Sequence, residues 1–178
     1  TGQSSLTLTI TDRIATILVP ANWNGSEVIT FTATDNDGTT PASDSDTATF
    51  TVTPVNDAPV VTDIPSETIA EGGSFTTISL DNYVSDVETA DALISWSATG
   101  QSALTITITE RVATITAPLD WNGSEEVTFT ATDSGDGSST ALSDSDTATF
   151  TVTPVNDSPL ITSSATTTAT EDVGYSYT

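Results

Sequence analysis

The sequence contains no histidine, cysteine, methionine or lysine, and its two basic residues are Arg13 and Arg111. Without the missing side chains there are no imidazole bases, thiol nucleophiles, Schiff-base lysines, disulfides or Cys/His zinc sites. Carboxylates, hydroxyls and two guanidinium groups are a poor set for catalysis. We therefore expect no enzyme and no catalytic residues.

Positive charge is scarce, since 25 acidic residues stand against two basic ones and leave a net charge of −23. A basic surface for nucleic acid or for anionic lipid is thereby excluded. No apolar run approaches the length that spans a bilayer, and the opening TGQSSLTL lacks the basic start and apolar stretch of a signal peptide. We expect neither nucleic-acid binding nor membrane insertion by this segment.

The sequence repeats itself with a period of about 100 residues. GQSSLTLTITDRIATI from Gly2 returns as GQSALTITITERVATI from Gly100, and SDSDTATFTVTPVND from Ser43 recurs letter for letter from Ser143. Prolines after the two VND sequences end strand pairing and mark boundaries. This register predicts the C-terminal part of one module at 1–57, a complete module at 58–157 and the beginning of another at 158–178. We infer either a window onto a longer tandem array or neighbouring chains that supply the missing strands.

Within each period apolar residues alternate with threonine, as in Leu6, Leu8 and Ile10. A period of two is typical of a strand with one buried face, and threonine suits the exposed face. High charge with only 35% hydrophobic residues is also typical of disorder, but the alternation argues against it. The spacing predicts an all-β sandwich with roughly seven strands in each module. The expected core residues are Phe75, Leu80, Ile94, Trp96, Ile115, Phe129 and Phe150.

The acidic residues gather in turns and at module boundaries, as at Asp35, Asp37, Asp133 and Asp157. Clustered carboxylates repel one another, and no nearby basic side chain offsets them. A bound Ca²⁺ ion can offset this repulsion, because it takes six to eight oxygen ligands from carboxylates, asparagines and backbone carbonyls. The spacing is not that of an EF-hand, so a calcium ion here must collect its ligands from separate loops.

Over essentially its whole length, the sequence resembles the cadherin-like repeats found in tandem in large bacterial surface adhesins and extracellular fibres. VNDAP from Val55 and VNDSP from Val155 are similar to the linker between such repeats. The resemblance implies tandem Ig-like, Greek-key β-sandwich modules with calcium at their joints. Other matching positions are Asp35 and Asp133 in ATD, Glu71 in IAEGGSF, Glu88 in SDVE and Asp120 in LDW.

The resemblance also implies which residues meet at each joint, where the linker of one module lies against loops of the next. At the first joint it groups Asn56, Asp57, Asp86, Glu88 and Asp133. At the second joint, which faces a further module, it groups Glu71, Asp120, Asn156 and Asp157. Asp35, the counterpart of Asp133, is a further candidate ligand. Asn22 stands where the second module has Asp120, so we expect one or two ions per joint rather than three.

Some acidic and aromatic residues have a simpler interpretation. Four acids near strand starts are interpreted as solvated residues that discourage edge-to-edge pairing, namely Asp44, Asp46, Asp144 and Asp146. Trp23 and Trp121 recur in the contexts NWNGSE and DWNGSE, which favours packing under a turn over stacking on a sugar. Ice binding by the threonine rows is disfavoured because a twisted sandwich is not flat. Glycoside cleavage by paired carboxylates is disfavoured because no cleft-forming insertion accompanies them.

Composition, repeat and resemblance together predict a structural and adhesive repeat of a secreted or cell-surface prokaryotic protein. Its modules would form a rod that Ca²⁺ stiffens at the joints. The predicted partners are neighbouring repeats, with surface glycans or proteins as external ligands. A filament assembled by strand exchange between chains is the alternative, and a carbohydrate-binding module is a third hypothesis.

Overall fold

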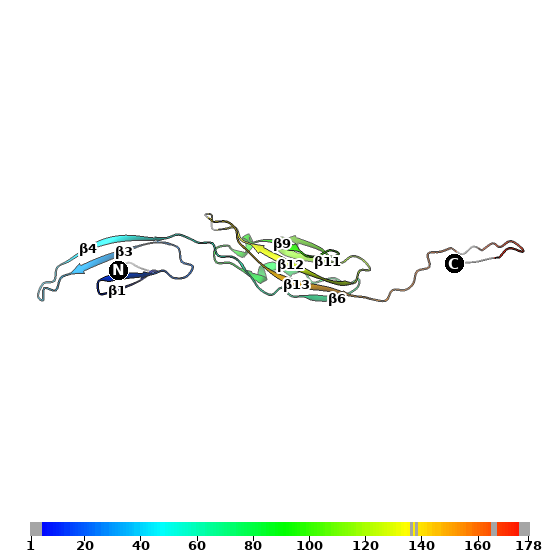
Figure 1. Cartoon of the computed structure of the whole chain (residues 1–178), viewed down its shortest axis with the longest axis horizontal. Coiled ribbons are helices and arrows are strands. Elements are labelled where there is room, and N and C mark those ends of the chain that lie inside the picture. Colours follow the sequence, from blue (N-terminus) through cyan, green and yellow to red (C-terminus); the bar gives the residue numbers. More distant parts are fainter. Residues whose placement is uncertain (1–4, 136, 138, 165–166, 175–178) are drawn as a thin grey trace.

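A computed structural model gives the chain an elongated shape, with two β-hairpins at one end, a β-sandwich in the middle and an extended C-terminal segment at the other end (Figure 1). The structure describes residues 5–135, 137, 139–164 and 167–174. Among these residues no helix is long and apolar enough to cross a membrane.

The first two hairpins are together called the hairpin pair. β1 (Thr7–Thr11) and β2 (Ile14–Leu18) join through Asp12 and Arg13, whose φ angles of 50° and 67° suit the two-residue turns that match strand twist. β3 (Gly25–Thr34) and β4 (Ser43–Val52) pair antiparallel along their whole length. Each hairpin forms its own two-stranded sheet. The predicted strand around Leu8 is thus confirmed.

The second unit, called the sandwich, contains nine strands from Val60 to Thr153 among the described residues. Its larger sheet has the order β6-β13-β12-β9, its smaller sheet the order β10-β11-β7, and β5 pairs with β8. Two 3-10 turns, η1 (Leu80–Tyr83) and η2 (Asp91–Leu93), connect strands. The strands are β5 (Val60–Val61), β6 (Glu67–Ala70), β7 (Ile78–Ser79), β8 (Val84–Ser85), β9 (Ser95–Thr99), β10 (Thr105–Thr109), β11 (Val112–Thr116), β12 (Gly123–Thr132) and β13 (Ser143–Thr153). The predicted all-β sandwich is confirmed.

The core of the sandwich is built from the residues that alternate with threonine. Phe129 and Phe150 are fully buried, and Phe75 meets Phe150 edge-on with ring centroids 5.3 Å apart. Such edge-to-face contacts add to the hydrophobic gain from burial. The predicted core is confirmed, with the difference that Trp96 lies half-buried at its margin.

The hairpin pair has nearly the same residues as the matching strands of the sandwich but buries them less. Phe31 is half-buried where its counterpart Phe129 is fully buried, and Ala33 is exposed where Ala131 is fully buried. The cause is the set of neighbours, because β13 lies between β12 and β6, whereas β4 pairs only with β3 among the described residues. The inner face of the hairpin pair is therefore left partly open. The module boundaries at 57/58 and 157/158 stay predictions.

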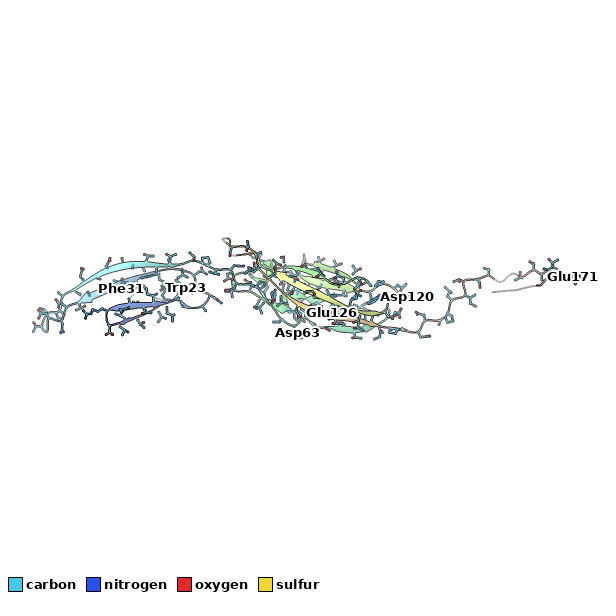
Figure 2. The ribbon with its side chains drawn as sticks, in the orientation of Figure 1. Trp23, Phe31, Asp63, Asp120, Glu126 and Glu171 are labelled. Carbon is cyan, nitrogen blue, oxygen red and sulfur yellow. The ribbon has the colours of Figure 1, made fainter. Side chains whose placement is uncertain are left out.

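The described residues after β13 contain no strand. This C-terminal segment leads away from the sandwich, and Figure 2 shows Glu171 near its far end. Leu160 and Ile161 in this segment are 85% and 81% exposed. The chain thus carries exposed apolar surface at both ends.

Candidate functional site

Three loop carboxylates meet at the end of the sandwich from which the C-terminal segment leaves. Ligand atoms of Glu71, Asp120 and Asp157, here called the acidic triad, all lie within 4.8 Å of one another. Glu71 is half-buried and the other two are exposed. Figure 2 shows Asp120 at this end of the sandwich, away from the hairpin pair.

Strand ends hold the triad in place. Glu71 follows β6, and its backbone N–H donates to the carbonyl of Thr153 at the end of β13 over 2.9 Å. Its Oε2 accepts a hydrogen bond of 3.0 Å from the N–H of Val155. Asp120 lies in the loop between β11 and β12 with a φ of 57°, and Asp157 lies in the linker after β13. Parallel pairing of β6 with β13 thus brings residues far apart in sequence to one point.

The triad is electrostatically costly without a cation. Two unit charges at this separation repel by roughly 1 kcal/mol in water and by about 3 kcal/mol at an effective dielectric constant of 20. Neither arginine stands in these loops, and Arg111 pairs with Asp81 at 2.9 Å. A donor set made only of oxygens suits a hard divalent cation such as Ca²⁺. Of the four residues predicted for the second joint, three converge here, and Asn156 is exposed with its amide donating to the Asp157 carbonyl over 3.4 Å.

At the first joint the linker residue Asn56 is inserted into the sandwich. It is only 7% exposed, and its Nδ2 donates to Asp133 Oδ2 over 2.9 Å and to the Thr140 carbonyl over 3.4 Å. Asp133 Oδ1 accepts from the N–H groups of Gly135 and Leu142. Burial raises the pKa of Asp133, but the hydrogen bonds from Leu142, Gly135 and Asn56 outweigh it and hold this pKa below its usual value. Asp133 is therefore a fully bonded anchor for the linker.

Two oxygens at the same end of the sandwich are buried without a hydrogen-bond partner among the described residues. They are Asn56 Oδ1 and Asp86 Oδ2. The other oxygen of Asp86 accepts from the N–H groups of Glu88 and Thr89 at 2.9 and 2.6 Å. Buried polar atoms normally have partners, so these two are the free donor atoms that a cation could use here. The other carboxylate beside them, Glu88, accepts from the N–H of Asp57 over 3.1 Å.

The structure thus gathers all five residues predicted for the first joint around the linker, while Asp35 lies elsewhere. Asp35 sits in the loop between β3 and β4, at the end of the hairpin pair far from the sandwich (Figure 1). There its Oδ1 accepts from the N–H groups of Asp37 and Ala42. A crevice of about 200 Å³ at the joint is lined by Asn22, Asp57 and Glu88 among others, so the neutral counterpart of Asp120 does face this joint.

The solvated interpretation of Asp144 and Asp146 is wrong. Both are half-buried, and Asp144 Oδ2 accepts from the N–H of Val61 over 2.8 Å while Asp146 Oδ2 accepts from the N–H of Ile64 over 2.6 Å. They fasten the segment before β6 to the edge of β13. A sequence signal existed, because both acids share the strand face of Ala148 and Phe150, which the alternation predicts to be buried.

The tryptophans pack as expected from their context. Trp121 is half-buried and packs against the core of the sandwich, with its ring directly over Gly123. Trp23 is likewise half-buried over Gly25. Figure 2 shows Trp23 at the end of the hairpin pair that faces the sandwich. These positions favour a structural role for both rings.

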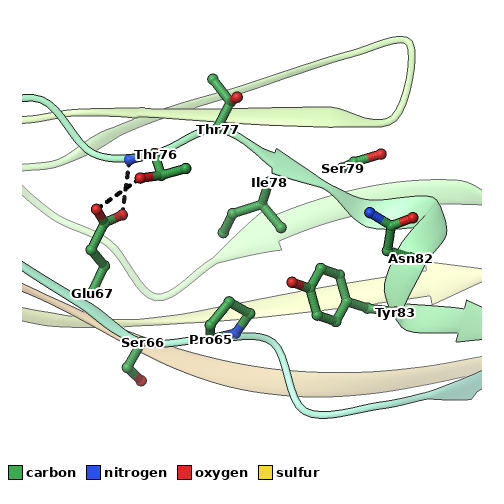
Figure 3. A pocket seen from close by; sticks show the side chains of 9 residues that line it. All are labelled: Pro65, Ser66, Glu67, Thr76, Thr77, Ile78, Ser79, Asn82 and Tyr83. Carbon is green, nitrogen blue, oxygen red and sulfur yellow. Dashed lines mark hydrogen bonds between the residues drawn. The ribbon is translucent and has the colours of Figure 1, made fainter.

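A concavity of about 380 Å³ lies between β6 and β7 of the sandwich (Figure 3). Glu67 is the one carboxylate among the residues that line it, and Thr76 donates to it from its N–H and its hydroxyl at 2.9 and 3.0 Å. Glycoside cleavage requires two carboxyl groups across the bond. This pocket does not offer that pair.

Comparison with known proteins identifies the family to which the sandwich belongs. The profile of the bacterial Ig domain matches residues 56–153, which is more than half of the chain. No curated protein matches the sequence. The solved structures that resemble it include an endo-fucoidan hydrolase of glycoside hydrolase family 107, with 21% identity and a TM-score of 0.41, where the match covers 88% of this chain and 23% of that one. They also include human mucin-like protocadherin EC1-2, with 12% identity and a TM-score of 0.49, where the match covers 87% of this chain and 83% of that one. At these scores neither structure bears on function, whereas the profile covers the sandwich and the linker residue Asn56. The chain belongs to the bacterial Ig domain family.

Proposed function

We propose that this chain is a structural and adhesive segment of a secreted or cell-surface prokaryotic protein, in which Ca²⁺ at the joints holds successive modules in line. The proposal assigns no catalytic step to the chain. Its partners are neighbouring repeats. The observation that carries it is the acidic triad, because three carboxylates converge where the chain leaves the sandwich and no basic group in these loops balances them.

Stiffening follows from where the ligands come from. Two domains joined by a few residues hinge freely unless their interface is large. Asp157 belongs to the linker, whereas Glu71 and Asp120 belong to the sandwich, so a shared ion ties the linker to the sandwich. The free energy of Ca²⁺ binding then stabilises the arrangement in which the modules are in line. Extracellular modules bind Ca²⁺ with Kd values of about 10⁻⁴ to 10⁻³ M, a range that makes the rod rigid outside the cell.

The first joint has a set of calcium ligands of the same kind, but with fewer charges. Asn56 Oδ1 and Asp86 Oδ2 are free, but Asn22 replaces the carboxylate that Asp120 provides at the second joint. Fewer charged ligands lower the affinity for Ca²⁺. We therefore assign the tighter calcium site to the acidic triad.

Calcium titration of the full chain tests the proposal. Isothermal titration calorimetry should show binding to the wild type that Asp120→Asn weakens by about tenfold or more, while Asp63→Asn, an exposed acid outside both joints, leaves it unchanged. The melting temperature should rise with Ca²⁺ and fall again with EGTA. Equal binding by Asp120→Asn and the wild type, or a melting temperature indifferent to Ca²⁺, would refute the calcium-stiffened rod.

A filament built by strand exchange is the second candidate, and one observation favours it. Ile10, Ile14 and Leu18 of the hairpin pair are 62%, 68% and 66% exposed. An apolar surface of this kind on strands with open edges is a template for pairing. The carbohydrate hypothesis has no comparable support, since Trp121 packs on the core.

A further inference from the structure

On one side of the sandwich, the gap between the edges of its two sheets is incompletely filled. β6 is an edge strand of the larger sheet and β7 an edge strand of the smaller one. β7 has only two residues, and Thr76 and Thr77 before it belong to no strand. Stacked sheets lie about 10 Å apart, so side chains have to fill the space between such edges. Here they leave the concavity of about 380 Å³ described above, now called the edge pocket.

The lining of the edge pocket combines apolar surface with many hydrogen-bonding groups. Seven of its nine lining residues have side chains that can form hydrogen bonds. The other two are Pro65 and Ile78, and Ile78 is only 7% exposed. Figure 3 shows the ring of Tyr83 pointing from η1 toward these two apolar residues. The pocket therefore offers an apolar wall with polar groups beside it.

Hydrogen bonds fix the two sides of the pocket before any ligand binds. Glu67 is half-buried on β6, and the N–H and the hydroxyl of Thr76 donate to its two oxygens. On the other side Tyr83 is half-buried, and its carbonyl accepts from the N–H of Thr62 over 2.8 Å. Leu80, the first residue of η1, donates its N–H over 2.9 Å to a carbonyl in the turn between β10 and β11. A preformed site loses less free energy to ordering when a ligand binds.

Polar groups in the pocket have bonding capacity left for a ligand. Within the part of the chain that the structure describes, no hydrogen bond engages the side-chain amide of Asn82 or the hydroxyl of Tyr83. The amide offers two donors and an acceptor, and the hydroxyl offers a donor and an acceptor. Each oxygen of Glu67 takes one bond from Thr76 and can accept another. This mixture of donors and acceptors matches a ligand with several hydroxyl groups.

The charge of the pocket favours an uncharged ligand. Among the described residues that line it, Glu67 is the one carboxylate and none is basic. An anion would meet this carboxylate and the field of a chain with a net charge of −23. A cation is not required, because the charge of Glu67 is already stabilised by two hydrogen bonds from Thr76.

We propose that the edge pocket binds one uncharged sugar unit of a surface glycan. The carbon-bound hydrogens of the sugar ring lie against Pro65 and the ring of Tyr83, and its hydroxyls bond to Glu67, Asn82 and the Tyr83 hydroxyl. A sugar ring carries both kinds of surface. The volume is at the lower end of the range of roughly 300–1,000 Å³ found for small-molecule sites, which suits a single unit.

This site is distinct from the tryptophans and from an open strand edge. Trp23 and Trp121 pack over glycines, so they supplied no basis for sugar binding. Strand addition needs a row of free N–H and C=O groups, whereas β7 has two residues and Pro65, shortly before β6, has no N–H. A peptide strand is therefore a poorer occupant of this side than a small ring.

The inference goes beyond the proposed function, because it gives the adhesive segment an external ligand at a place away from the joints. Neither the acidic triad nor any of the residues gathered at the first joint lines the edge pocket. Sugar binding should therefore be equal in Ca²⁺ and in EGTA. A chain that binds Ca²⁺ but no sugar refutes this inference alone. A chain that binds sugar but no Ca²⁺ refutes the calcium-stiffened rod alone.

An NMR titration of the full chain in EGTA tests the site. The probes are methyl β-D-glucopyranoside, methyl β-D-galactopyranoside and methyl α-D-mannopyranoside, with glucuronate as the anionic and tetramethylammonium as the cationic comparison. We expect at least one glycoside to shift the amide signals of Thr77, Ser79 and Asn82 with a Kd of about 1 mM, and both ions to bind at least about tenfold more weakly. No shift with any glycoside, or equal binding of either ion, overturns the proposal.

Two variants separate sugar binding from folding. Tyr83→Phe keeps the ring and removes the hydroxyl, and Asn82→Ala removes an exposed amide. Each should weaken glycoside binding by about threefold to tenfold, the value of one hydrogen bond, and leave the melting temperature unchanged. Asn122→Ala, at an exposed asparagine outside the pocket, is the matched control and should bind like the wild type. Wild-type affinity in both pocket variants, or equal weakening in all three, contradicts the proposed site.

Discussion

The loop between β9 and β10 is closed by one side chain, and removing its charge gives a sharp test of how this acid-rich chain is stabilised. Glu125 on β12 accepts hydrogen bonds from the N–H groups of Ser102, Ala103 and Leu104, at 3.0, 2.8 and 3.0 Å, and from the Ser102 hydroxyl. Burial raises the pKa of Glu125, but these bonds outweigh it and lower the pKa from 4.5 to about 2. The charged form is therefore the one that closes the loop.

Glu125→Gln should destabilise the sandwich at neutral pH. The amide keeps one oxygen acceptor but turns an NH₂ group toward the N–H groups of Ser102 and Leu104, which both bond to Oε2. Hydrogen bonds to charged groups contribute about 1.5–3 kcal/mol each, and water can replace part of this at the exposed Ser102. We expect a loss of about 2 kcal/mol, which for a domain of this size lowers Tm by roughly 8–16 °C.

The sign of the pH effect follows from the lowered pKa. A group whose pKa is lower in the folded state stabilises that state above its unfolded pKa, and this contribution is lost as the pH falls through the folded value. The difference between wild type and Glu125→Gln should thus be full at pH 7 and shrink between about pH 4.5 and pH 2. Urea unfolding followed by tryptophan fluorescence measures it. Glu126→Gln, an exposed neighbour on the same strand, is the control. An equal midpoint for wild type and Glu125→Gln at pH 7, or a difference that persists at pH 2, would falsify this account.

Of three further predictions, two use the internal repeat as a control and the third uses Ca²⁺. Asp144→Asn with Asp146→Asn should destabilise the sandwich by about 1–3 kcal/mol in urea unfolding, because both N–H bonds weaken, whereas Asp44→Asn with Asp46→Asn should leave monomer stability unchanged. Gly123→Ala should lower the free energy of unfolding by about 1–3 kcal/mol, since the φ angle of Gly123 is 154° and a Cβ there would lie 2.8 Å from the Trp121 ring. Gly25→Ala should lower it by less, because the matching distance to the Trp23 ring is 3.4 Å. Asn56→Asp should lower Tm in EGTA by placing a carboxylate against Asp133, and added Ca²⁺ should restore it; no recovery with Ca²⁺ would argue against a cation at the first joint.

The strands and the core were predictable because their signal is local. The alternation of apolar residues with threonine fixes which side of each strand is buried, and Phe129 and Phe150 are accordingly at zero exposure. The same alternation did not predict that Phe31 would be only half-buried, because burial depends on neighbouring strands as well as on the strand itself. Because the hairpin pair and the sandwich contain matching residues, comparing them separates the effect of a strand's own sequence on burial from the effect of its neighbouring strands.

The gathering of acidic residues at the two joints was predictable only through a family resemblance, since Glu71, Asp120 and Asp157 are far apart in sequence. No local pattern reports that parallel pairing of β6 with β13 brings Glu71 beside the linker. The roles of Asp144 and Asp146 were missed for a related reason. Their partners are N–H groups of a distant segment, and a polar residue on a strand face predicted to be buried was the available signal.

With only two arginines, the carboxylates of this chain have two ways to be stabilised in the folded state, and the structure separates them. Asp133, Asp144, Asp146 and Glu125 accept backbone N–H groups, which explains how an acid-rich strand face can be partly buried without any basic residue. Asp120 and Asp157 lie close to each other and to Glu71, whose Oε2 takes one such bond, so their mutual repulsion is not offset from within the chain. The first group is expected to stabilise the fold in EGTA, whereas the second is expected to stabilise it only when Ca²⁺ is present and to destabilise it in EGTA through mutual repulsion. Comparing Glu125→Gln with Asp120→Asn in the two conditions therefore tests this division directly, and a calcium-dependent effect of Glu125→Gln would contradict it.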